Sequence, residues 1–129
     1  MNKIIVEVSV GELLDKISIL EIKQGKIKDP EKLKFIFNEH SILKKQLENN
    51  VKINPEIDKL YQKLKDINGK LWNIEDDKRE CEKEKEFGEK FIKLSRDVHF
   101  LNDERAKIKL EINNYTSSKI KEIKEYTSY

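Results

Sequence analysis

The residues best suited to chemistry gather in one short segment, "LWNIEDDKREC" at positions 71–81. It holds the only tryptophan, the only cysteine, three consecutive carboxylates and an arginine. Adjacent carboxylates suggest a cation site, because Mg²⁺ prefers carboxylate oxygens. A helix turns 100° per residue, however, so Trp72, Glu75 and Arg79 share one flank while the two aspartates point elsewhere. The segment therefore predicts one Trp–Glu–Arg face rather than a three-carboxylate metal site.

Arginine is rare in this chain, and its positions suggest a specific use. Only three of 27 basic residues are arginine, namely Arg79, Arg96 and Arg105. Arginine presents a flat fork of donors that fits a carboxylate or a phosphate better than lysine does. Arg105 also interrupts an apolar helical stripe, so its guanidinium must meet a carboxylate, a carbonyl or a bound anion. The alternative is chance combined with ordinary surface ion pairs.

Polar residues on the first predicted helix could complete such a site. Glu21 falls inside an apolar arc, where a carboxylate needs a partner unless its head reaches water. The mixture of carboxylates, cations and amides suits an anionic ligand such as a nucleotide, sugar phosphate or nucleotide sugar, with Mg²⁺ as a possible cofactor. No catalytic residue or metal ligand is assigned. The ligand-binding candidates are Glu12, Asp15, Lys16, Glu21, Lys23, Trp72, Glu75, Arg79, Arg96, Asn102, Asp103 and Arg105.

Four helices are expected to position these residues in an all-α, antiparallel helical bundle. Ser9 and Glu12 form a capping box at the first helix, and Asp29 before Pro30 caps the second. Apolar residues at alternating spacings of three and four predict coiled-coil-like packing of the two longest helices. The expected elements are an extended arm over 1–8, helices over about 9–28, 30–49, 55–85 and 89–115, and a short helix or tail over 116–129.

Composition narrows the class of protein. The 129 residues are 40% charged and 36% apolar, with 4 Gly and 2 Pro, which favours one domain of long helices. The net charge of +2 arises from interleaved acids and bases and argues against nucleic-acid binding. No apolar run is long enough for a membrane span, and a cytoplasmic location is expected. Long stripes on only four helices leave apolar edges, so a homodimer is predicted.

Three blocks resemble an uncharacterised family of small all-helical bacterial and phage proteins. They are "VEVSVGELLDKISILEIK", "LWNIEDDKREC" and "FGEKFIKLSRDVHFLNDERAKIKLEIN", joined by the ending "KEYTSY". Members of that family are often encoded beside glycosyltransferases for surface polysaccharide, or fused to them. The resemblance implies that the blocks act as a set, and it implies no reaction.

Two functions therefore compete, and whether the protein is an enzyme stays open. The first is a polar interhelical site for an anionic ligand. The second is a non-enzymatic accessory module for a surface-polysaccharide glycosyltransferase, in which the polar residues form a structural network that fixes helix pairing. In that second case the arm over 3–8 adds to a partner's sheet or pairs with its copy in a dimer.

Overall fold

The computed structural model describes residues 2–118, 123–125 and 127–129, and its elements are four helices. They are α1 (Val10–Lys26), α2 (Pro30–Asn50), α3 (Pro55–Glu84) and α4 (Glu89–Tyr115). The described residues contain no strand, and the predicted all-α bundle is confirmed. Of the short helix or tail predicted over 116–129, residues 119–122 and 126 lie outside the described residues, and the described residues of this range form no helix.

The helix ends follow from capping residues. The side chain of Ser9 accepts a hydrogen bond from the backbone N–H of Glu12 at 3.0 Å, which satisfies one donor that the first turn leaves unpaired. The Glu12 carboxylate does not complete the predicted box, because it accepts a hydrogen bond from Lys109 instead. Asp29 caps α2 as predicted, while α1 ends at Lys26, two residues earlier than expected.

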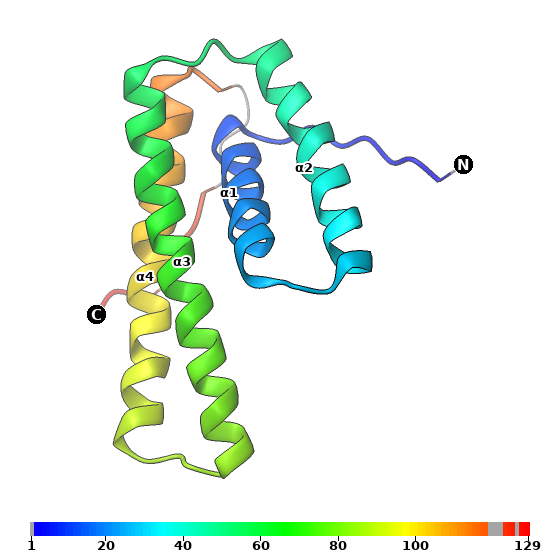
Figure 1. Cartoon of the computed structure of the whole chain (residues 1–129). Helices are drawn as coiled ribbons and strands as arrows, with labels where there is room; N and C mark the ends of the chain where they lie inside the picture. The colour runs from blue at the N-terminus through cyan, green and yellow to red at the C-terminus, as the bar shows by residue number, and fades with distance from the viewer. Residues whose placement is uncertain (1, 119–122, 126) are drawn as a thin grey trace.

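The helices form an antiparallel hairpin with a shorter pair laid against it (Figure 1). α3 and α4 make the hairpin, α1 packs against both of them, and α2 packs closely on α1 alone. At 1.5 Å per residue, the 30 residues of α3 extend about 45 Å and the 17 of α1 only about 25 Å. The hairpin therefore projects well beyond α1 and α2, which leaves a step where α1 ends. Coiled-coil packing within the hairpin stays a prediction.

The hydrophobic core lies at the end of the hairpin that α1 and α2 cover. One cluster of buried side chains joins all four helices: Leu14, Ile17, Leu47, Ile57, Leu60, Leu64 and Ile112. Among the described residues in the projecting part of the hairpin, Cys81 is the one apolar residue that is buried. None of the described helices is long and apolar enough to cross a membrane.

Candidate functional site

A buried ion pair joins α1 to α4. Asp15 is only 2% exposed, and its Oδ1 accepts hydrogen bonds from Arg105 Nε at 2.9 Å and from Asn68 Nδ2 at 2.8 Å. Its Oδ2 accepts a further bond from Arg105 Nη2 at 2.5 Å. This two-point contact is the geometry in which arginine outperforms lysine. The carboxylate that Arg105 required in its apolar stripe is therefore Asp15, and Asn68 links the pair to α3.

The charge of Asp15 is stabilised by these partners. Burial by itself would raise the pKa of the carboxyl, because it penalises the charged form. The hydrogen bonds from Arg105 and Asn68, with the charges of Arg105 and Lys109, outweigh burial and hold the pKa of Asp15 below its ordinary value. Asp15 is therefore ionised at neutral pH.

The same network continues toward the start of α1. Lys109 Nζ lies 2.7 Å from Glu12 and 3.9 Å from Asp15, so two carboxylates face two cations across α1 and α4. One turn further along, the backbone N–H of Gly11 donates to Asn113 Oδ1 at 2.7 Å. A Cβ at Gly11 would stand 2.6 Å from the Lys109 carbonyl oxygen, so only glycine permits this close approach. These contacts fix how α1 lies on α4.

Glu21 belongs to a separate cluster that joins α1, α2 and α3. Its carboxylate accepts hydrogen bonds from the Tyr61 hydroxyl and from Lys65 at 3.3 Å, and it lies 3.0 Å from His40 Nε2. Burial alone would raise the pKa of Glu21, but the bonds from Tyr61, His40 and Lys65 lower it. Burial and the neighbouring carboxylate raise the pKa of Tyr61, which therefore stays a neutral donor. Glu21 therefore has the hydrogen-bond partners that a carboxylate inside an apolar arc needs.

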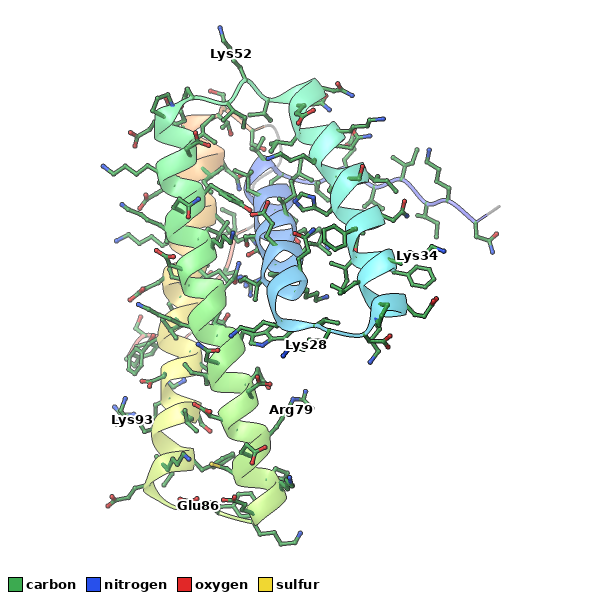
Figure 2. The ribbon with its side chains drawn as sticks, in the orientation of Figure 1. Lys28, Lys34, Lys52, Arg79, Glu86 and Lys93 are labelled. Carbon is green, nitrogen blue, oxygen red and sulfur yellow. The ribbon has the colours of Figure 1, made fainter. Side chains whose placement is uncertain are left out.

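A cleft of about 360 Å³ opens where the hairpin emerges beyond α1. It is bounded by three of the helices, and Figure 2 shows Arg79 projecting from α3 on the side where α1 ends. Trp72, Glu75 and Arg79 line it, as one face of α3 predicts, and Arg105 joins them from α4. The remaining lining residues are Ile19, Ile22, Asn68, Leu71 and Asp76. The expectation that both aspartates of this segment point elsewhere is therefore wrong for Asp76, which follows Trp72 by four residues and so lies one helical turn along the same side.

The polar side chains of this cleft differ in how exposed they are and in how they are anchored. Arg79 and Glu75 are 80% and 56% exposed and stand 3.9 Å apart, which is a loose ion pair on one helix surface. Arg105 is 27% exposed and anchored by Asp15, so its guanidinium is held in a fixed position. The cleft thus combines an aromatic ring, an exposed cation and an anchored cation.

The other candidates lie outside the cleft. Asn102 Oδ1 approaches Arg105 Nη1 at 3.5 Å, and Lys16 is exposed with Glu12 3.8 Å away. Lys23 is half-buried in the last turn of α1. Arg96 is exposed and stands over the Phe100 ring at 6.0 Å, whereas Asp103 accepts a hydrogen bond from the Tyr129 hydroxyl. The twelve candidates therefore do not converge on one site.

Several hydrogen-bond partners could not be predicted from the sequence. Helical spacing shows which residues share a face of one helix, but it does not pair them with residues on other helices. Tyr61 and Lys65 are spaced as an i,i+4 pair beside the α3 stripe, which hints at a shared partner but does not identify Glu21. The hydroxyl of Ser18 accepts a hydrogen bond from Asn68 Nδ2 at 2.8 Å, and nothing in the sequence indicated this contact. Across the described residues, no group of three or more His, Cys, Asp or Glu side chains could hold a metal ion.

Comparison with known proteins gives a family and nothing finer. No curated protein and no solved structure matches the chain. A family model described as a family of unknown function (DUF6165) matches residues 4–129, which is nearly the whole sequence. The chain therefore belongs to this family of unknown function.

Proposed function

We propose that the protein binds a nucleotide or nucleotide sugar in the cleft between α1, α3 and α4. The observation that carries this proposal is the meeting of Trp72, Arg79 and Arg105 along one cleft with apolar walls. Small-molecule sites are typically apolar clefts with a few placed polar groups. An indole face can stack on a base, and a guanidinium fork can take a phosphate.

The spacing favours a ligand with separate aromatic and anionic ends. Trp72 and Arg79 are seven residues apart on α3, so their Cα atoms stand about 10 Å apart along the helix axis. An inorganic anion would contact Arg79 without reaching Trp72, whereas a nucleotide would contact both. Because Arg79 is largely exposed and only loosely paired with Glu75, it can turn toward a phosphate with little loss.

Magnesium enters this proposal only together with the ligand. Mg²⁺ in nucleotide sites is held by one or two carboxylates and by substrate phosphates. Glu75 and Asp76 are the carboxylates that line the cleft, and they would supply those protein ligands. No reaction is proposed.

The experiment uses the single tryptophan as its reporter. Because Trp72 is the only tryptophan in the chain, its fluorescence reports on this cleft alone. Titration with nucleoside diphosphates and nucleotide sugars, with and without Mg²⁺, should change the emission and saturate, whereas inorganic phosphate should not. Arg79→Gln should weaken binding about 10- to 100-fold, since a charged hydrogen bond contributes about 1.5–3 kcal/mol.

A matched control is Arg96→Gln, which removes an exposed arginine that does not line this cleft. It should leave the affinity unchanged. Trp72→Leu, followed by calorimetry, should weaken nucleotide binding by about 1–3 kcal/mol, the contribution of one stacked base. Absence of both a fluorescence change and a thermal shift at millimolar concentrations of every ligand would refute the proposal.

The second candidate is the non-enzymatic accessory module for a surface-polysaccharide glycosyltransferase. It is favoured by the interhelical network, in which Glu12 and Asp15 are matched by Arg105 and Lys109 and fix how the helices pack. Sedimentation of the protein mixed with a surface-polysaccharide glycosyltransferase from the same organism would test this function. Complex formation that persists in Arg79→Gln, without any ligand response, would favour the module over the nucleotide site.

A further inference from the structure

The N-terminal arm, residues 2–8, exposes an unusual amount of apolar surface. Ile4 is 88% and Ile5 82% exposed, and Val6 and Val8 are also exposed. Figure 1 shows the arm leaving the start of α1, crossing α2 in this view and extending beyond it to the N-terminus. Contiguous exposed apolar side chains of this kind mark surfaces that a partner covers.

The backbone of the arm is equally available. Residues 2–8 form no helix and follow an extended course in Figure 1, and within the described residues no hydrogen bond ties them to the rest of the chain. An extended segment with unpaired N–H and C=O groups is a template for pairing with another strand. Its run of β-branched residues, "IIV" at positions 4–6, favours the extended conformation.

The charges of Lys3 and Glu7 favour one partner strand, which is the arm of a second copy of the chain. In an antiparallel pair centred on Ile5, Lys3 of each copy stands opposite Glu7 of the other. Opposite charges facing each other across strands are stabilising. A parallel pair in register would instead set Lys3 against Lys3 and Glu7 against Glu7, which is destabilising. Moving the centre to Val6 would leave Glu7 opposite Ile5, so only one register matches both charges.

We propose that the protein dimerises through an antiparallel ribbon formed by the arms of two copies, centred on Ile5. The register is two-fold symmetric, as an isologous dimer requires. Ile4, Val6 and Val8 of both copies then share one face of the ribbon, because side chains alternate along a strand. A two-stranded ribbon is marginal by itself, so this face needs support. Phe35 and Ile42, both exposed and seven residues apart on α2, supply an apolar surface for it.

Cysteine cross-linking tests the register directly. In the proposed ribbon Ile5 faces Ile5 at about 4.5–5.5 Å between Cα atoms, which a disulfide can bridge. Ile5→Cys should therefore give a covalent dimer on mild oxidation. Ile4→Cys is the matched control. In this register Ile4 stands opposite Val6 of the other strand, so the Cα atoms of the two Ile4 residues lie about 8.5 Å apart, beyond the reach of a disulfide. Wild type controls for Cys81, which is buried.

Charge exchange tests the same register in solution. Sedimentation equilibrium at low salt should show a wild-type dimer, and Lys3→Glu or Glu7→Lys alone should weaken it on the order of tenfold. The double variant Lys3→Glu/Glu7→Lys restores opposite charges at both positions and should restore the dimer. These exposed arm substitutions should leave the helices intact, which circular dichroism would verify.

Three outcomes would overturn the proposal. They are a monomeric wild type at several hundred micromolar, equal cross-linking of Ile5→Cys and Ile4→Cys, or a double charge variant as weak as the single ones. The proposal is independent of the nucleotide site, because no arm residue lines the cleft.

Discussion

Replacing Arg105 with methionine tests whether the buried ion pair holds the fold together. The change keeps an unbranched side chain but removes both contacts to Asp15. Asp15 would retain Asn68 at 2.8 Å and Lys109 at 3.9 Å, which do not replace a two-point pair. Breaking one side of a buried pair costs about 3–5 kcal/mol. Since Arg105 is 27% exposed, water recovers part of this loss, and we expect about 3 kcal/mol.

This loss corresponds to a measurable change in melting temperature. At about 2.1 cal/mol/K per residue, 129 residues have an unfolding entropy of about 0.27 kcal/mol/K. The midpoint should therefore fall by about 11 °C at pH 7, as followed by circular dichroism. The matched control is Arg79→Met, which breaks an exposed pair at 3.9 Å and should change the midpoint by less than about 2 °C.

The pH dependence provides a second, independent readout. Because the folded protein lowers the pKa of Asp15, the carboxylate contributes stability that is present above its unfolded pKa of about 3.9. That stability is lost as the pH falls through the folded pKa. The gap between wild type and Arg105→Met should therefore narrow below about pH 4. A gap under about 4 °C at pH 7, or one that does not narrow in acid, would refute this role for the pair.

Four further substitutions test the local geometry by thermal or urea unfolding, apart from the cleft and the arm. Gly11→Ala should destabilise the fold by more than about 1 kcal/mol, because its Cβ would lie 2.6 Å from a backbone oxygen. Gly69→Ala is the control, because its Cβ would meet nothing within 4 Å, and it should stabilise the fold by about 0.5–1 kcal/mol. Tyr61→Phe removes a donor to Glu21 and should cost about 1–3 kcal/mol, so an unchanged urea midpoint would contradict the cluster. Ser9→Ala should cost about 1 kcal/mol through loss of the cap, and an equal stability would contradict it.

Much of the fold could be predicted from the sequence, because local signals determine it. Capping at Ser9 and Asp29 and apolar periodicity give the four helices to within a few residues. The sequence also indicates that Glu21 and Arg105 need partners, since both interrupt apolar stripes.

The identity of those partners was not predictable, because helical periodicity describes one helix at a time. Which faces of different helices meet depends on how far each helix is rotated and shifted along its neighbour. Arg105 reaches Asp15 and borders the cleft with Glu75, whereas Glu21 lies in another cluster altogether. A one-residue shift of α1 would change the partners of both Asp15 and Glu21.

The close packing of α2 on α1 alone has a consequence for opening motions. α3 and α4 hold each other, and α1 contacts both, so these three helices can stay together when α2 detaches. The amide hydrogens of α2 should therefore exchange with solvent through a partial opening, at lower free energy than those near Leu64 or Ile112, which need global unfolding. Such an opening would separate His40 from Glu21 while leaving Asp15 and Arg105 joined. We therefore expect the molecule to open first at α2, with α1, α3 and α4 still packed together.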